Sequence, residues 1–359
     1  MDPILPTDPL PALLGDALDP ASDLPRLDPA VAEVTADRIA ELIDEIKLSA
    51  DKLAKDRTNR GDVKILSRTL RELRYAFKVF APYRTCRKVT IFGSARTQPH
   101  QPAYRQAVEF GRRMAEHQWM VVTGAAAGIM EAGHVGAGRE NSLGLNILLP
   151  FEQASNPIIA GDPKLVHMKY FFTRKLMFVK ESDAICLLPG GFGTLDEGLE
   201  VLTLLQTGKR DLVPVVMLDE PGGDYWAALE TFIHEQLLAK ALIGPDDLHL
   251  YKRTDRVDEA VEEVLSFFRV YHSMRYVHGK LALRLNRRPG KAALETIQTQ
   301  FADILAEGRF ELCGQLPEEK GETTLAGLPR MAFQYNRYNQ GRLRQLIDFL
   351  NRIPEGELD

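Results

Sequence analysis

The residues Leu188–Gly198, LPGGFGTLDEG, combine four glycines, a threonine and two adjacent carboxylates between an apolar run and a helical pattern. If a helix begins near Gly193 or Thr194, the free amides of residues 191–194 form a nest for an anion beside the Thr194 hydroxyl. Glu197 follows Thr194 by three residues, so both lie on one face of that helix. The helix dipole favours an ionised carboxylate, which suits a base or a stabiliser of positive charge. The alternative is a tight strand-to-helix turn with an ordinary acidic first turn.

A pair of adjacent cations, Arg174 and Lys175, begins the helix predicted to precede the next strand. Cations at a helix start are unfavourably placed, because the helix dipole is already positive there. Their position therefore indicates an anionic partner, either a ligand phosphate or a carboxylate such as Glu197. A solvent-facing pair without a role is the alternative.

Two further small-residue loops follow apolar strands. FGSAR contributes Gly93 and Ser94, and TGAAAGIMEA contributes Gly124, Gly128 and Glu131. Backbone can approach a ligand closely at such loops, although tight packing of helix on strand also requires small residues. Three of them at three strand ends favour a pocket of nucleotide size. Neither G-x-G-x-x-G nor a Walker sequence is present, so a dinucleotide or an ATP-driven motor is not indicated. The histidines lie singly, so we expect no metal, and we expect no cofactor.

The elements that must position these loops follow an alternating pattern. Apolar strands such as KVTIF, WMVV and DAICLL alternate with helical stretches over residues 86–269. This pattern predicts an α/β fold, a Rossmann-like parallel sheet with helices on both faces. Residues 1–30 read as a loosely ordered leader and 31–85 as a helical extension. Residues 270–359 read as a small α+β region, in which a helix reaches to Met274, another spans 291–308, two short strands follow, and a final helix closes the chain.

Composition narrows the class of protein. The net charge of -5 favours no nucleic acid or membrane partner, and no apolar run approaches the ~20 residues of a membrane span. Three widely separated cysteines and an acidic, proline-rich start without a signal-peptide pattern predict a cytoplasmic protein. The second helix of the extension is basic, and a solvated or partner-facing helix is favoured there over a nucleic-acid face.

The motif PGGFGTLDE resembles the P-G-G-x-G-T-x-x-E signature of the LOG ("Lonely Guy") family of nucleoside-5′-monophosphate phosphoribohydrolases, whose members are often labelled lysine decarboxylases. TRK resembles the Arg-Lys element of that family, and the other two loops resemble its glycine loops. The resemblance implies hydrolysis of the N-glycosidic bond of a purine or cytokinin ribotide such as AMP, with Arg174 and Glu197 as the catalytic pair. It further implies a homo-oligomer, a dimer or higher, that takes a small-molecule nucleotide. The substrate-binding positions would be Gly93, Ser94, Gly124, Gly128, Glu131, Lys175, Pro189, Gly190, Gly191, Gly193 and Thr194, with the phosphate on the last four.

One departure from the family pattern falls in the second loop. The family carries consecutive glycines where this chain has Ala125, Ala126 and Ala127, and the added methyl groups are expected to narrow the approach of a ligand. A non-catalytic nucleotide sensor on the same fold is therefore the alternative function. Amino-acid decarboxylation has little support, because no lysine has a context specific for a Schiff base.

Overall fold

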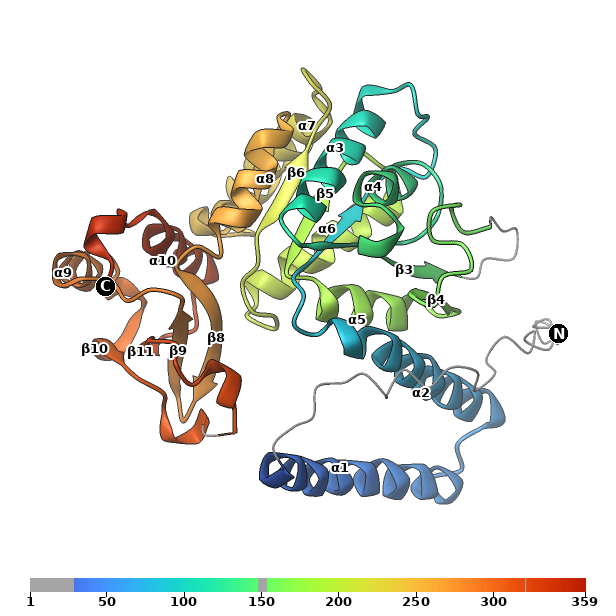
Figure 1. Ribbon diagram of the computed structural model, residues 1–359, viewed down its shortest axis with the longest axis horizontal. Coiled ribbons are helices and arrows are strands. Elements are labelled where there is room, and N and C mark those ends of the chain that lie inside the picture. The colour runs from blue at the N-terminus through green and yellow to red at the C-terminus, as the bar shows by residue number, and fades with distance from the viewer. Residues whose placement is uncertain (1–28, 148–153, 320) are drawn as a thin grey trace.

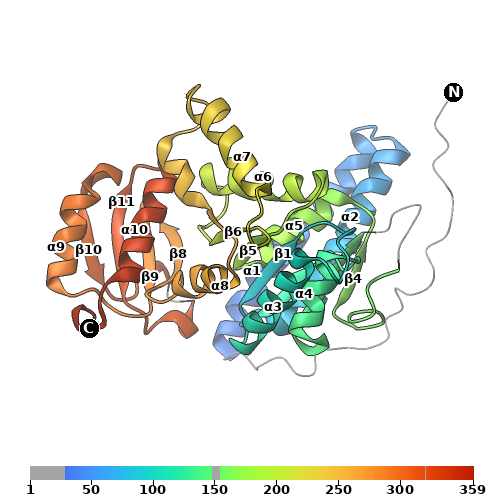
Figure 2. The same cartoon turned by 90° about the horizontal axis from the view of Figure 1, so that it is seen from above.

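The computed structural model describes residues 29–147, 154–319 and 321–359 (Figure 1). The predicted leader therefore lies almost entirely outside the described residues. The described chain begins with two helices, continues through an α/β domain and ends in a small antiparallel sheet (Figures 1 and 2).

The α/β domain is built on a seven-stranded parallel sheet with the order β4-β3-β2-β1-β5-β6-β7. Every residue of the central strands β1 and β5 is buried, as their continuous apolar sequences predicted. The strands are β1 Lys88–Phe92, β2 Met120–Thr123, β3 Ser142–Ile147, β4 Leu165–Met168, β5 Ala184–Leu187, β6 Val215–Leu218 and β7 Lys252–Thr254. The predicted Rossmann-like α/β sheet is confirmed.

Helices cover both faces of this sheet. Val89 and Ile91 of β1 share a core with α3 (Pro102–Glu116), α4 (Ile129–Ala137) and α8 (Val257–Ser266). Phe92 points to the opposite face, because successive side chains of a strand alternate, and its ring lies 4.8 Å from that of Phe178. That face carries α2 (Arg60–Phe80), α5 (Phe171–Glu181), α6 (Phe192–Gln206) and α7 (Tyr225–Phe232), the last continued by a π-helical turn at Ile233–Leu238.

The two N-terminal helices differ in how they contact the body. Helix α2 packs on α5 and β4, whereas α1 (Pro29–Lys55) lies apart from the α/β domain and runs back beneath it (Figure 1). Its side chains Ile39, Leu42 and Ile46 recur at helical spacing and are exposed. The predicted helical extension is thus two helices, one packed on the domain and one lying apart from it.

The C-terminal region departs from the prediction. The helix predicted to reach Met274 ends at Ser266, and residues Tyr271–Val277 form strand β8 instead. It pairs with β9 (Lys280–Leu285) through a two-residue turn at His278 and Gly279, whose φ angles are 44° and 86°. Positive φ at both turn residues matches the right-handed twist of paired strands, and this turn was missed in the sequence.

The helix predicted over 291–308 is also shorter. Helix α9 spans Lys291–Gln300, and β10 (Leu305–Cys313) begins five residues after it ends. With β11 (Arg330–Tyr335) the sheet has four strands in the order β10-β11-β9-β8, two more than predicted, and α10 (Gln340–Arg352) packs against it. In the part of the chain that the structure describes, no helix is both long and apolar enough to cross a membrane.

Candidate functional site

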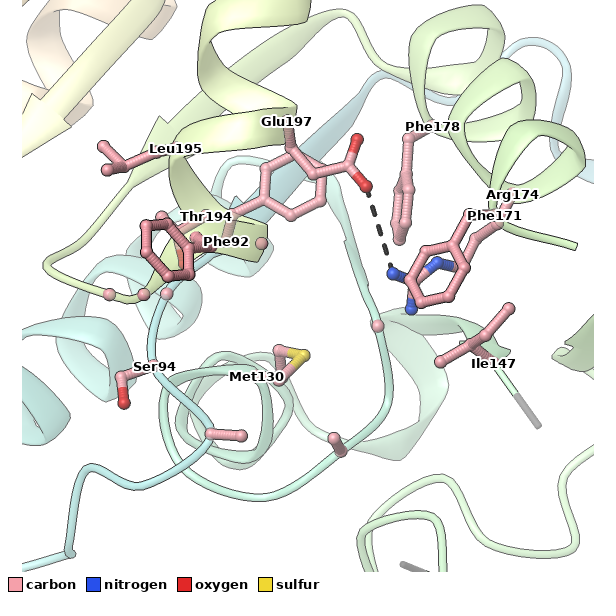
Figure 3. A pocket seen from close by; sticks show the side chains of 18 of the residues that line it. Phe92, Ser94, Met130, Ile147, Phe171, Arg174, Phe178, Thr194, Leu195 and Glu197 are labelled. Atoms are coloured by element: carbon pink, nitrogen blue, oxygen red, sulfur yellow. Dashed lines mark ion pairs between the residues drawn. The ribbon is translucent and has the colours of Figure 1, made fainter. Parts of the chain in front are cut away.

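The three small-residue loops meet at the carboxyl ends of β1, β2 and β5 around a cavity of about 790 Å³ (Figure 3). Parallel sheets gather their ligands at this edge. Nine of the predicted site residues line it: Gly93, Ser94, Gly124, Arg174, Gly190, Gly191, Gly193, Thr194 and Glu197. The remaining wall is largely apolar and was not predicted, comprising Phe92, Met130, Ile147, Phe171, Phe178, Phe192 and Leu195 among others.

Ser94 ties the three loops to one another. Its amide donates to the Pro189 carbonyl at 3.1 Å, and its carbonyl accepts from the Ile129 amide at 3.0 Å. Gly128 has φ +68°, and a Cβ there would lie 2.3 Å from the Ser94 carbonyl oxygen. Pro189 and Gly128, both predicted to bind substrate, therefore hold the loops together and do not line the cavity.

The start of α6 has the open backbone that the predicted anion cradle requires, with one difference from the expectation. The helix begins at Phe192 after Gly191, which makes no side-chain cap. Added methyl groups at Gly191 or Gly193 would meet nothing within 4 Å, so both positions face open space. The Thr194 amide donates to the Gly191 carbonyl at 3.0 Å and so is not free for an anion. Fewer backbone amides are thus available to an anion than the four of residues 191–194.

Arg174 and Glu197 face each other across the cavity (Figure 3). Arg174 Nη2 lies 4.0 Å from Glu197 Oε1, and both side chains are largely buried, with 15% and 7% exposed. The guanidinium lies against the rings of Phe171 and Phe178, at 5.1 and 5.7 Å from their centroids. Arg174 Nε is buried without a hydrogen-bond partner among the described residues. The guanidinium and the carboxylate are not in direct contact, and Arg174 Nε has a hydrogen bond still to donate. The space between them can therefore accommodate a polar group of a ligand.

Burial sets the charge of Glu197 differently from the expectation. Desolvation raises the pKa of Glu197 to about 7, although the charges of Arg174 and Lys175 lower it. The helix dipole was expected to favour the ionised form, and burial acts in the opposite direction on a side chain that is only 7% exposed. Near neutral pH this group can both accept and release a proton.

Two of the residues predicted to bind substrate do not line the cavity. Lys175 Nζ pairs with Asp196 Oδ2 at 2.7 Å and with Glu200 Oε2 at 2.5 Å. Its anionic partners are therefore carboxylates of α6. Glu131, placed on the first turn of α4, is not among the residues that line the cavity.

The alanines of the second loop obstruct the cavity less than expected. Ala125 has φ 59° and is fully buried against Ile159 and Leu165, so its methyl group points away from the cavity. Of the three alanines only Ala126 lines the cavity. The left-handed conformation of Ala125 gives a physical reason why glycine suits this position.

A buried histidine supports the same loop. His134 Nε2 lies 3.1 Å from the Leu143 carbonyl, and its Nδ1 lies 3.2 Å from Asn156 Nδ2. The backbone amide of Asn156 in turn donates to the Ala125 carbonyl at 2.8 Å. Burial lowers the pKa of His134 to about 4, so the ring is neutral near pH 7 and its contacts support the loop. Among the described residues no cluster of three or more His, Cys, Asp or Glu could hold a metal ion.

Comparison with known proteins adds to this geometry. Residues 122–264 match the protein family described as "Possible lysine decarboxylase". The chain is 28% identical over 183 residues to the probable cytokinin riboside 5′-monophosphate phosphoribohydrolase LOGL2 of Oryza sativa subsp. japonica, covering 50% of this chain and 72% of that protein. It is 29% identical over 181 residues to the cytokinin riboside 5′-monophosphate phosphoribohydrolase LOG7 of Arabidopsis thaliana, covering 46% of this chain and 80% of that protein.

Among solved structures, the molybdenum cofactor binding protein from Rippkaea orientalis matches with a TM-score of 0.35 and 20% identity, over 50% of this chain and 94% of that one.

The residues that match the family, 122–264, include the second and third small-residue loops together with Arg174 and Glu197.

Proposed function

The α/β domain is homologous to the LOG phosphoribohydrolases at modest identity over about half the chain, and we propose that it hydrolyses nucleoside 5′-monophosphates. The substrate would be a purine or cytokinin riboside 5′-monophosphate of the AMP type. The products would be the free base and ribose 5-phosphate.

One observation carries the proposal: a buried arginine and a buried carboxylate, 4.0 Å apart, face the cavity whose other wall is a glycine cradle at a helix start. The open positions at Gly191 and Gly193 leave room for a phosphate close to the positive end of α6. The apolar wall, which includes Met130 and Phe171, suits the flat face of a base.

The chemistry follows from these groups. The bond between the anomeric carbon and the base nitrogen breaks, its electron pair leaves with the base, and positive charge develops on the sugar. A water oxygen bonds to that carbon, and ionised Glu197 takes a proton from the water. The departing base takes up one proton, and release of the proton from Glu197 restores the carboxylate. Arg174 keeps its proton, so it serves to grip phosphate or to hold Glu197. The carboxylate also stabilises the developing positive charge.

The test is base release from AMP and from isopentenyl-AMP, followed by chromatography. We expect free base and ribose 5-phosphate in equal amounts. Glu197→Gln should lower turnover by about 10²–10⁴-fold with binding largely kept, since it removes base catalysis and charge stabilisation. Arg174→Ala should weaken binding and turnover together. Tight ribotide binding by wild type without base release across a ribotide panel would instead identify a nucleotide sensor.

A further inference from the structure

Helix α2 of the N-terminal extension places one carboxylate, that of Glu72, at the start of α5. Glu72 Oε2 accepts a hydrogen bond from Thr173 Oγ1 at 2.8 Å, and Glu72 Oε1 accepts one from the Lys169 amide at 3.0 Å. Thr173 is fully buried, and the Glu72 side chain is 10% exposed. Thr173 directly precedes Arg174, so this contact lies one residue from the site.

Helix α5 needs an anion at this end. Its N-cap residue, Tyr170, makes no side-chain cap, and its first turns carry Arg174 and Lys175 at the positive end of the helix dipole. Glu72 supplies negative charge there and satisfies a backbone amide just before the helix. Arg68 Nε, 3.8 Å from Glu72 Oε1, lies on the same face of α2 and stabilises the carboxylate charge.

The Arg174 side chain has few contacts of its own that fix its position. Its Nε has no partner among the described residues, its separation from Glu197 is 4.0 Å, and the rings against it, Phe171 and Phe178, belong to α5 itself. The placement of the guanidinium therefore depends on where the first turn of α5 lies.

We propose that Glu72 is a positioning residue for Arg174, through which the N-terminal extension forms part of the site; its kinetic consequence rests on the function proposed above. The matched family region begins at residue 122, so this carboxylate lies outside it. The competing interpretation is that Glu72 only fastens α2 to the domain. Both interpretations expect lower stability when Glu72 is removed, and they differ in what happens at Glu197.

The charged groups that act on Glu197 are Arg174, Lys175, Asp196 and Glu200, and Arg174 is the strongest of the two that favour its ionised form. If the guanidinium moves away, the pKa of Glu197 rises, and the acid limb of kcat/KM moves to higher pH. A fastening role would lower the unfolding temperature and leave this limb where it is.

The experiment compares Glu72→Ala, Glu72→Gln and Thr173→Val with Glu41→Ala, an exposed carboxylate of α1 that serves as the control. We expect Glu72→Ala to lower kcat/KM with AMP on the order of 10-fold and to raise the acid limb. Glu72→Gln, which keeps an acceptor oxygen, should fall between wild type and alanine. The double variant Glu72→Ala/Thr173→Val should be little worse than Glu72→Ala alone, because the two side chains act through one contact.

An unchanged limb in Glu72→Ala and Glu72→Gln, with kcat/KM within twofold of wild type, would overturn the proposal. If wild type releases no base, the proposed function fails, and Glu72 is judged by AMP affinity in calorimetry and by hydrogen exchange of residues 169–175. Weaker AMP binding with faster exchange there then supports the positioning role. Wild-type affinity and exchange reject it.

Discussion

Glu197 experiences opposing influences, since burial favours its neutral form and Arg174 and Lys175 favour its ionised form. With a pKa of about 7, the ionised fraction falls tenfold for each pH unit below that value. We therefore expect kcat/KM for AMP to rise with pH up to about 7 and then to level, whereas an ordinary glutamate would level near 4.5. The measurement is a pH series of base release. The substrate phosphate, with a second pKa of about 6, is titrated separately by phosphorus NMR.

Arg174→Ala extends this test, because removal of the positive charge should move the acid limb of the kcat/KM profile to higher pH. A limb near 4.5 in wild type would contradict the raised pKa of Glu197.

The same side chain is predicted to lower the stability of the fold. A pKa higher in the folded than in the unfolded chain means that stability is greatest below about 4.5 and is lost as pH rises through about 7. Glu197→Gln imitates the protonated form, so it should be more stable than wild type at pH 8 by up to about 3 kcal/mol and similar at pH 4.5. Urea unfolding of both proteins at the two pH values measures the difference. An equal difference at both would contradict a titration origin.

Single residues of the site were predicted unevenly, and the reason is physical. Glu197 was predictable from its spacing after Thr194, because spacing along a helix determines which residues share a face. Arg174 was singled out by a cation at a helix start and by the family resemblance. The charge state of Glu197 was not predictable, since it depends on water excluded by Phe92 and Phe178, which come from other elements. Glu72 was missed for the same reason: its partner Thr173 is about a hundred residues away.

At the scale of elements, the start of α6 contains two glycines with different tasks. A methyl group at Gly190 would lie 2.1 Å from Thr194 Oγ1 and 3.0 Å from the Ser94 amide, whereas one at Gly193 would meet nothing within 4 Å. Gly190→Ala should destabilise the protein by about 1–3 kcal/mol, because the loops must move apart. Gly193→Ala should leave stability equal or slightly higher, since alanine favours a helix, and should weaken phosphate binding.

Thermal unfolding and AMP calorimetry on the two variants separate these effects. Equal stability losses in both, or unchanged AMP affinity in Gly193→Ala, would contradict the assignment of the cradle to the open face of α6.

The elements themselves were predictable where one period dominates. Continuous apolar strands between amphipathic helices specified the parallel sheet, because a strand buried on both faces has little choice of side chain. In the C-terminal region the pattern after α8 continues the helical period to Met274, and the competing signal is only the turn at His278 and Gly279. Strand pairing with β9 decided the structure there, and pairing is a non-local interaction that periodicity does not contain.

At the scale of the whole molecule, one hydrophobic core runs from the α/β domain into the C-terminal sheet. Leu205 and Val213 of the domain belong to the same cluster as Tyr271, Leu283 and Phe333 of the sheet. A shared core predicts that the two parts unfold together, although each has its own sheet.

A buried ion cluster in the C-terminal sheet allows this to be tested. Glu319 is fully buried, 2.6 Å from Arg284 Nη2 and 3.0 Å from Arg330 Nε. Glu319→Ala leaves two buried guanidinium groups without this partner and should cost about 3–5 kcal/mol. Trp119 and Trp226 both lie in the α/β domain. If the two parts unfold together, their fluorescence in this variant should change at the same lowered urea concentration as the circular dichroism signal.

Glu318→Ala, at the exposed neighbouring position, serves as the control and should change stability by less than about 0.5 kcal/mol. A tryptophan transition that stays at its wild-type urea concentration while circular dichroism shows an earlier step would reveal two independently folding units.

The double hydrogen bonding of Ser94 has a consequence for how a ligand would be received. Its amide and carbonyl join the first loop to the third and second loops before any ligand is present. Little chain entropy is then left to lose on binding, so the affinity for the proposed nucleotide would depend on removal of water from Arg174 and Glu197 more than on ordering of loops. A site of this kind distinguishes ligands by shape with little adaptation. On the function proposed above, rigid walls that include Met130 and Ile147 would select among bases by the space that already exists.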